Sequence, residues 1–245
     1  MWPRRIEEAS LNAWPALQQL LYDGWIVRLA NGYTKRANSV TPLYPSALPL
    51  GEKVVHCERL YHARGLPAIF RLTSLETPPG LDDLLAERGY RLVDPTLVLH
   101  RDLATGTGPT PAGVMRCAGL EEWLRLYTRV GGAPLESDAR HAAILTAIVP
   151  ETYAAYRTAP DGSAAACGLA VQEDDVVGIF DLVTAPTQRR RGHASALVAA
   201  MLHWATAAGA RHAYLQVVRD NAPARRLYER LRFTERYHYW YRVGR

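Results

Sequence analysis

Apolar and polar residues alternate along this chain with two periods, one typical of helices and one typical of strands. Over residues 6–21 the apolar positions recur every three or four residues, which predicts an amphipathic helix. A hairpin is predicted next, with strands over 25–29 and 33–40 joined by an Asn31-Gly32 turn. The following elements are a proline-rich loop over 41–51, a helix over 52–64, a strand over 68–73, a short helix over 80–88 and a long strand over 90–101.

A run of small residues and prolines over 104–111 interrupts this pattern and is the clearest linker in the chain. Helices and strands then alternate again up to an aromatic strand at the C-terminal end. The predicted elements are a strand over 114–117, helices over 120–130 and 137–148, strands over 153–158, 164–172 and 176–183, a helix over 192–208, a strand over 213–218, a helix over 222–231 and a strand over 233–242. A mixed α/β sheet with helices on its faces is the most economical architecture for this order.

Two parts of the chain are similar to each other. Residues 65–101 and residues 209–242 both predict a strand, a helix and a strand. Their helix ends can be overlaid so that Leu85 stands where Tyr228 stands. We prefer the interpretation that the fold is duplicated, and chance similarity of short α/β segments is the rival.

Several classes of protein are disfavoured by composition. No apolar run approaches the ~20 residues that a bilayer span needs. Residues 6–21 are interrupted by polar side chains, whereas a signal peptide has an unbroken apolar centre. The three cysteines, Cys57, Cys117 and Cys167, are not spaced for a zinc site or a set of disulfides, so we expect no metal and a reducing, cytoplasmic location.

Charge is distributed unevenly along the chain. Residues 186–245 hold twelve arginines against three acidic residues, a net charge of +9, while residues 1–185 carry −4, which together give +5. A basic end is typical of a protein that meets a polyanion, either a nucleic acid or a phosphorylated cofactor. The arginines are dispersed over the predicted helices and strands without a recognised nucleic-acid module, so we rank nucleic-acid binding last.

Three of these arginines precede a glycine where a strand gives way to a helix. Arg189, Arg190, Arg191 and Gly192 lead into an alanine-rich helix. The first turn of a helix exposes N–H groups without intrahelical partners, and the helix dipole adds positive charge there. Gly192 lets the backbone approach a ligand closely, and the small Ala194 and Ser195 leave the entrance open. The sequence therefore predicts a site for a phosphate-rich anion.

This stretch resembles the signature of the GCN5-related N-acetyltransferase (GNAT) family. In that family a strand is followed by [Gln/Arg]-x-x-Gly-x-[Gly/Ala] at the start of a helix, which here is the run from Arg189 to Ala194. The second half of the signature is an Asn followed seven residues later by Tyr, matched here by Asn221 and Tyr228. The chain has neither a P-loop nor a dinucleotide fingerprint.

The resemblance implies the GNAT fold and acetyl-CoA as the acetyl donor. It is good over residues 112–245 and faint before them, so we expect a degenerate GNAT-like domain over 1–104, a linker over 105–111 and a catalytic domain over 112–245. The loop would hold the pyrophosphate, and a bulge in the preceding strand would free backbone groups for the pantetheine arm. The expected cofactor-binding residues are Val183, Thr184, Arg189, Arg190, Arg191, Gly192, His193, Ala194, Ser195, Asn221 and Ala224.

Tyr228 is the expected general acid, because a phenol is protonated at neutral pH and can donate a proton to the departing thiolate. The general base is open, because the position where many relatives have Glu is Gln216 here. Asp181, in an otherwise apolar strand, is our first candidate base, and a structural carboxylate at the sheet rim is the alternative. Further candidates are Glu136, Asp138 and His141, whereas His56 and His62 are expected on the surface.

The expected function is transfer of an acetyl group to a primary amine of a small molecule or a peptide by direct attack. The negative charge before residue 186 favours a cationic or an N-terminal amine. For the polar run beside the predicted turn we consider two interpretations, a solvated edge or a segment whose Arg36 and Asn38 reach across to the acceptor pocket. A non-catalytic acyl-CoA-binding module is the alternative function. The aromatic terminal strand could also pair two copies in a homodimer.

Overall fold

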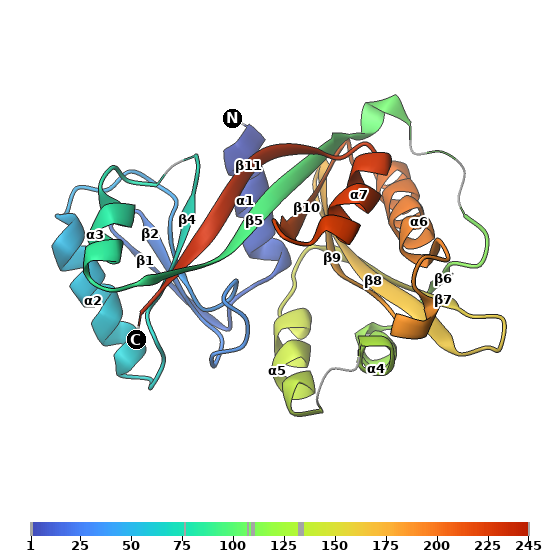
Figure 1. Cartoon of the computed structure of the whole chain (residues 1–245), viewed down its shortest axis with the longest axis horizontal. Coiled ribbons are helices and arrows are strands. Elements are labelled where there is room, and N and C mark those ends of the chain that lie inside the picture. Colours follow the sequence, from blue (N-terminus) through green and yellow to red (C-terminus); the bar gives the residue numbers. More distant parts are fainter. Residues whose placement is uncertain (1, 76, 107, 109–110, 132–134, 245) are drawn as a thin grey trace.

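The computed structural model (Figure 1) describes residues 2–75, 77–106, 108, 111–131 and 135–244, without the side chains of residues 135–138. Within those ranges eleven strands form one mixed sheet. The strands are β1 (Gln18–Tyr22), β2 (Trp25–Leu29), β3 (Val40–Pro42), β4 (Ile69–Thr73), β5 (Arg91–Asp102), β6 (Met115–Arg116), β7 (Glu151–Thr158), β8 (Ala164–Glu173), β9 (Val176–Thr184), β10 (His212–Val218) and β11 (Thr234–Val243). The α-helices are α1 (Trp2–Ala13), α2 (Leu50–His62), α3 (Leu81–Glu87), α4 (Leu120–Gly131), α5 (Leu135–Thr146), α6 (His193–Ala207) and α7 (Ala222–Arg230).

Two long strands cross the middle of the molecule and join its two halves (Figure 1). The strand order is β1-β2-β3-β4-β11-β5-β10-β9-β8-β7-β6. The last strand of the chain, β11, therefore lies between β4 and β5, and β5 lies between β11 and β10. Each half of the sheet thus contains a strand from the other half of the chain.

The pattern of parallel and antiparallel pairing is the same when the sheet is followed from β1 or from β7 toward its centre. Among the described strands, only the short β6 has no counterpart. On each side of the central pair β11–β5, the next two strands are parallel to each other, β4 with β3 on one side and β10 with β9 on the other. An antiparallel strand or pair of strands lies outside each parallel pair. Both parallel pairs are joined by a helix, α2 in the first half and α6 in the second, and a second helix leads on to the crossing strand. The prediction of a mixed α/β sheet is confirmed.

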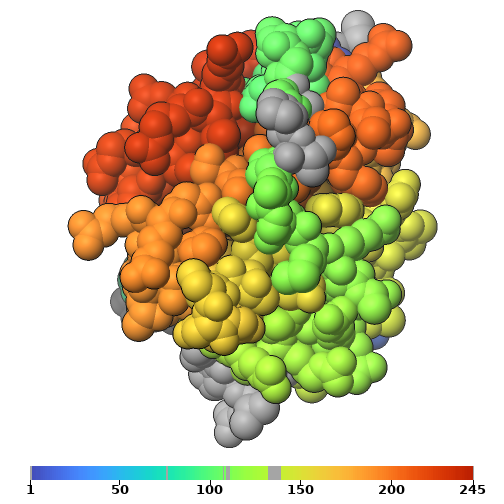
Figure 2. Space-filling model, turned by 90° about the vertical axis from the view of Figure 1, so that its right-hand side faces the viewer, coloured from blue at the N-terminus to red at the C-terminus, as the bar shows by residue number. Residues whose placement is uncertain are grey.

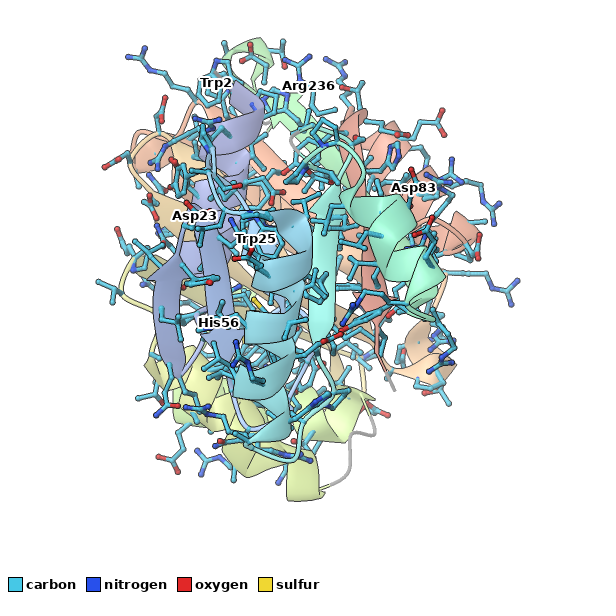
Figure 3. All side chains as sticks on the ribbon, turned by 90° about the vertical axis from the view of Figure 1, so that its left-hand side faces the viewer. Trp2, Asp23, Trp25, His56, Asp83 and Arg236 are labelled. Carbon is cyan, nitrogen blue, oxygen red and sulfur yellow. The ribbon has the colours of Figure 1, made fainter. Side chains whose placement is uncertain are left out.

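Helices cover both faces of the sheet. Figure 3 shows α2 and α3 over one face of the first half. In the second half, α6 packs on β7, β8 and β9 from one side, while α4 packs on these strands and α1 packs on β8 and β9. Alternate residues of β8 enter different cores, since Leu169 belongs to the cluster that includes Trp123 and Ala170 to the cluster under α6. Figure 2 shows the face formed by the second half, with the green segment after β5 running down it.

The helix predicted over residues 6–21 is wrong in its extent. The chain forms α1 only to Ala13, and residues 18–22 form β1, which pairs antiparallel with β2. Pro15 explains the end of the helix, because a residue that precedes proline is pushed out of the helical region. The apolar residues 17, 20 and 21 that suggested helical spacing lie in or just before the new strand.

The strand over 25–29 is confirmed and pairs antiparallel with the next strand, but the second strand predicted over 33–40 is wrong, because residues 40–42 form it and only Val40 belongs to both ranges. The turn residues Asn31 and Gly32 both have positive φ, +52° and +74°. β3 begins only at Val40, because the Asn38 side chain organises residues 30–34 as a turn. Its carbonyl oxygen accepts hydrogen bonds from the N–H of Ala30 (2.7 Å) and of Gly32, and its amide donates to two further carbonyls.

The aromatic terminal strand lies inside the sheet, which argues against the suggestion that it pairs two copies. The rings of Tyr237, Tyr239 and Tyr241 are all buried. β11 is hydrogen-bonded on both edges, to β4 and to β5. Residues 239–243 of β11 therefore have no edge for a second copy.

Arg232, directly after α7, has a left-handed backbone with φ +63°, where the matching Gly89 after α3 has φ +81°. Both residues close the same turn, with N–H to carbonyl distances of 2.9 Å. Because glycine adopts this conformation without a side-chain clash, we expect Arg232→Gly to raise the free energy of unfolding by about 0.5–1 kcal/mol, measured by urea denaturation. As the matched control, Arg226→Gly inside α7 should lower it by about 1 kcal/mol. A loss of stability in both variants would contradict this account.

Candidate active site

The loop before α6 is a concave row of backbone N–H groups. Arg190 and Gly192 have positive φ, +63° and +80°, and the residues between and after them do not. When right-handed and left-handed backbone conformations alternate, successive N–H groups point to the same side. Such an arrangement is an anion-binding nest. Within the described residues, none of the N–H groups from Arg189 to Ser195 has a hydrogen-bond acceptor. The predicted anion site is therefore present in its backbone geometry.

Three side chains with unpaired buried polar atoms accompany this loop. His193, the first residue of α6, has no hydrogen-bond partner for either ring nitrogen within the described residues. The Gln188 side-chain oxygen and the Arg157 Nε are unpaired in the same way. Burial lowers the pKa of His193, and the charges of Arg157 and Arg191 lower it further. A neutral imidazole that is buried without partners fits a ligand with polar atoms, because such groups cost free energy when they are left unpaired.

Arg157 was missed by the sequence analysis. It lies on β7 and faces Ala166 of β8, which itself faces Thr184 of β9, so the sheet brings it near the end of β9. No local pattern distinguishes this arginine from the others in the sequence. Only the pairing of β7, β8 and β9 reveals its position.

β9 and β10 diverge directly before this loop. Their parallel pairing runs from Val176 and His212 to Ile179 and Leu215 and then stops, although β9 continues to Thr184. The backbone of Val183 and Thr184 is bonded to β8 on one side, opposite Cys167 and Ala166. On the other side no strand pairs with it within the described residues. Both residues therefore lie where an extended ligand can add to the edge of β9.

Asp181 forms a bulge at the point where the strands diverge. Leu169 faces Phe180 and Cys167 faces Val183, so one residue of β8 stands opposite both Asp181 and Leu182. Asp181 has a positive φ of +46°, which is unusual for a residue with a side chain. A bulge changes the direction in which a side chain points and often lies beside an active site.

The Asp181 carboxylate is hydrogen-bonded to His141 of α5. The distance from His141 Nε2 to Asp181 Oδ2 is 2.8 Å, and both side chains are at most one-tenth exposed. Nδ1 of His141 has no partner within the described residues. Burial raises the pKa of the neighbouring Tyr127, and the charge of Asp181 raises it further, so this phenol stays neutral. The structure thus joins two of the candidate bases into one pair.

Aromatic rings from both halves of the chain surround His141. The rings of Trp14 and Tyr33, from the first half, have centroids 5.5 and 5.7 Å from the imidazole. The rings of Trp123 and Tyr127, from α4, lie at 5.8 and 5.0 Å. The first half of the chain therefore contributes directly to this site.

The structure separates the two residues of the polar run, Arg36 and Asn38, because only Arg36 extends toward the candidate site. Arg36 reaches β9, since its guanidinium carbon lies 6.0 Å from the centre of the Phe180 ring and 5.0 Å from that of Trp14. Asn38 is buried and fully engaged in the turn described above. Arg36 can meet a ligand at this site, whereas Asn38 is a structural residue.

Asn221 and Tyr228 both belong to α7. The Asn221 side chain caps the helix by accepting the N–H of Ala224 at 3.2 Å. Tyr228 is buried in the cluster beneath α6 and α7, and burial raises its pKa to about 12. Its hydroxyl makes no hydrogen bond to the described residues, which leaves it free to donate to a ligand.

The remaining candidates have simpler outcomes. Gln216 accepts a hydrogen bond from the Tyr239 hydroxyl at 3.1 Å, as expected of a side chain that takes no proton. The side chains of Glu136 and Asp138 lie outside the described residues. His62 is exposed, while His56 stacks on Tyr22 with centroids 3.9 Å apart and lies on α2 (Figure 3).

Metal and membrane elements were also sought in the described part of the chain. It contains no group of three or more His, Cys, Asp or Glu side chains placed to hold a metal ion. It also contains no helix long and apolar enough to cross a bilayer.

The chain is similar to several known acetyltransferases. The family model described as the C-terminal region of the probable histone acetyltransferase Rv0428c matches residues 3–242. The chain is 28% identical over 249 residues to the uncharacterized N-acetyltransferase YobR of Bacillus subtilis, covering 99% of this chain and 98% of that protein. It is also 28% identical over 220 residues to Rv0428c of Mycobacterium tuberculosis, covering 87% of this chain and 65% of that protein. A solved GCN5-related N-acetyltransferase from Kribbella flavida is similar in structure, with a TM-score of 0.73 and 21% sequence identity. The match covers 98% of this chain and 95% of that protein.

Proposed function

Because this chain belongs to the family of the Rv0428c C-terminal region and is an acetyltransferase of the GNAT type, we propose that it transfers an acetyl group from acetyl-CoA to a primary amine of a small molecule or peptide. The observation that carries the proposal is the row of unpaired N–H groups from Arg189 to Ser195 beside the diverging strands. A non-catalytic acyl-CoA-binding module would need the same row. It would not need a buried carboxylate–imidazole pair at the bulge.

The chain's own residues can hold acetyl-CoA in three places. The nest and the arginines of the loop suit the phosphates, because both supply positive charge and N–H donors. His193 and Arg157 add donors that have no partners of their own. The open edge of β9 at Val183 and Thr184 suits the amide groups of the pantetheine arm.

When bound, acetyl-CoA supplies the acetyl thioester that an amine attacks. We assign the Asp181–His141 pair as the base that takes the proton of the attacking amine, with Asp181 orienting the imidazole; their hydrogen bond supports this role. We assign Tyr228 as the acid, since its raised pKa keeps the phenol protonated over the whole physiological range. Holding both substrates in one site supplies much of the rate through proximity.

We also propose that the chain is a fused pair of GNAT-like units, with the boundary near residues 105–111, and that only the second unit binds acetyl-CoA. The symmetric strand order and the helix turns that match at Gly89 and Arg232 support the duplication. In the first half, α2 begins ten residues after Val40, whereas α6 begins sixteen residues after the matching Val177. The difference arises mainly because β3 ends at Pro42, whereas β9 continues to Thr184, so the described part of the first half has no counterpart of the β9 end that leads into the loop.

The loop of the first half is also occupied by a side chain of its own. The Asp23 carboxylate accepts the N–H groups of Ala47 and Leu48 at 2.9–3.1 Å, beside the start of α2 (Figure 3). The pKa of Asp23 is lowered to about 2. The hydrogen bond from Leu48 has the largest effect, and the Lys53 ammonium and the hydrogen bond from Ala47 add to it. An internal carboxylate thus stands where the second half leaves N–H groups free for an anion.

The proposal is tested by following CoA thiol release from acetyl-CoA with a panel of amines and peptides, alongside calorimetric binding of acetyl-CoA. We expect Gly192→Asp to weaken acetyl-CoA binding about a hundredfold, because like charges placed together cost several kcal/mol and Asp tolerates a left-handed backbone. Gly209→Asp is the matched control, since Gly209 has φ +97° and open space at the other end of α6. Equal binding by both variants, or no thiol release with any amine, would refute the proposal.

A further inference from the structure

Arg36 has no charged partner among the side chains that the structure describes. It lies in the connection between β2 and β3, and its side chain is half-buried. Within the described residues its guanidinium makes no ion pair and no hydrogen bond, whereas the neighbouring Lys35 pairs with Asp94 at 2.8 Å. A half-buried guanidinium normally has a carboxylate or several carbonyl partners, so an unpaired one at a substrate site points to a ligand.

The backbone around Arg36 is held firmly. Its carbonyl oxygen accepts a hydrogen bond at 2.7 Å from Arg28, which is fully buried and also donates to the carbonyls of Leu11 and Trp14. Lys35 and Asn38 fix the same segment from either side. The guanidinium is therefore presented from a rigid support rather than from a freely moving loop.

The position of Arg36 relates it to the catalytic pair. The Trp14 ring is shared, with the Arg36 guanidinium carbon 5.0 Å and the His141 ring 5.5 Å from its centre. The Phe180 ring, which Arg36 also touches, belongs to the residue directly before Asp181. A cation from the first half of the chain and an anionic pair from the second half thus meet around one aromatic ring.

We infer, on the basis of the function proposed above, that the acceptor is an amine that carries a carboxylate, as a free amino acid does. Arg36 would bind the carboxylate, since its planar fork of N–H donors matches the two oxygens. The aromatic rings and Asp181 would attract the ammonium group before it loses its proton. An acceptor with only positive charge would leave Arg36 facing a like charge.

The chemistry balances without any further reactant. The ammonium group first gives one proton to the Asp181–His141 pair and thence to solvent. The neutral amine nitrogen forms a bond to the acetyl carbon while the carbon–sulfur bond breaks. The second amine proton goes to the pair, which releases it to solvent, and the departing thiolate takes a proton from Tyr228, which solvent restores. The products are an N-acetyl amino acid and the CoA thiol.

The test compares each of the twenty free amino acids with its carboxamide as acceptor, at saturating acetyl-CoA, by thiol release. We expect the wild type to prefer the carboxylate member of the best pair by about 10- to 100-fold in kcat/KM, which is typical of a charged hydrogen-bonded contact. Arg36→Ala should abolish that preference while changing kcat/KM for the carboxamide less than threefold, and Arg36→Lys should retain part of it. Arg125→Ala, which removes the same charge from an exposed pair on α4, should keep the preference.

The outcomes separate the two proposals. If the wild type acetylates amines but treats acids and carboxamides alike, or favours a lysine side chain in a capped peptide, the inference is overturned and the acetyltransferase activity stands. If Arg36→Ala slows both members of a pair equally, Arg36 does not bind the carboxylate. If no acceptor yields thiol although acetyl-CoA binds, the proposed function fails together with the inference. Should Arg36→Ala not fold, the wild-type comparison and Arg36→Lys still decide.

Discussion

Replacing Glu7 with glutamine is expected to lower the free energy of unfolding by about 3–5 kcal/mol, the cost of breaking a buried ion pair from one side. The Glu7 carboxylate on α1 accepts hydrogen bonds from both terminal nitrogens of Arg71, which lies on β4. The Tyr237 hydroxyl on β11 donates to the same carboxylate. Both charged side chains are only 2% exposed. Thermal unfolding should shift downward by roughly 6–20 °C in a chain of this size.

The physical reason is that Arg71 would be left as an uncompensated buried charge. Burial by itself would lower the pKa of Arg71, but the Glu7 carboxylate outweighs burial and raises that pKa. The guanidinium also lies 3.9 Å from the centre of the Tyr239 ring, which cannot replace a carboxylate.

Two further variants distinguish a charge effect from a general weakness of α1. Arg5→Ala removes a partly exposed pair with Glu173 from the same helix and should cost less than about 1 kcal/mol. The double variant Glu7→Leu with Arg71→Met should recover much of the lost stability, since a buried pair can be replaced by apolar side chains of similar volume. A double variant less stable than Glu7→Gln would show that the charges are not the cause.

Replacing Tyr228 with phenylalanine is expected to lower kcat by about 10²-fold or more, as is typical when a general acid is removed. Binding of acetyl-CoA should change less than twofold, because the variant keeps the ring and its packing against Phe233. Stopped-flow measurement of thiol release, together with calorimetric binding, separates the two effects. The reading of Tyr228 as a packing residue predicts no change in kcat.

The pH dependence adds a second readout for Tyr228. Because burial raises its pKa to about 12, the phenol stays protonated between pH 6 and pH 10 and begins to ionise only near the upper value. Any limb of the rate profile within this range should therefore come from other groups and have the same shape in the wild type and in Tyr228→Phe. Tyr90→Phe, which removes a hydroxyl bonded to Glu58 in the first half, should leave kcat unchanged. A new alkaline limb in Tyr228→Phe would argue against this assignment.

The sequence predicted the parts of the site that are built from neighbouring residues. The loop around Gly192 could be predicted because its arginines, its glycine and the helix after it are contiguous, and the structure shows the expected free N–H groups. The helix cap at Asn221 is local in the same sense. Elements of the second half were predicted to within a few residues because their apolar periods are strong.

The parts built from distant residues could not be predicted. His141 and Asp181 are forty residues apart, and no pattern in the sequence pairs one particular histidine with one particular carboxylate. The position of β11 inside the sheet follows from strand pairing across the chain, which the alternating tyrosines of this strand do not specify. The end of α1 was misjudged because the apolar residues of β1 continue the helical spacing past Pro15.

The two crossing strands have a consequence for any attempt to shorten this protein. Without the first half, β10 would lose β5, its hydrogen-bonded neighbour on the side away from β9, and β11 would lose both of its neighbours. The same cut would remove Trp14 and Arg36 from the surroundings of His141. The first half is thus part of the working enzyme even though it binds no acetyl-CoA of its own in our proposal. We therefore expect neither half to fold as a separate module.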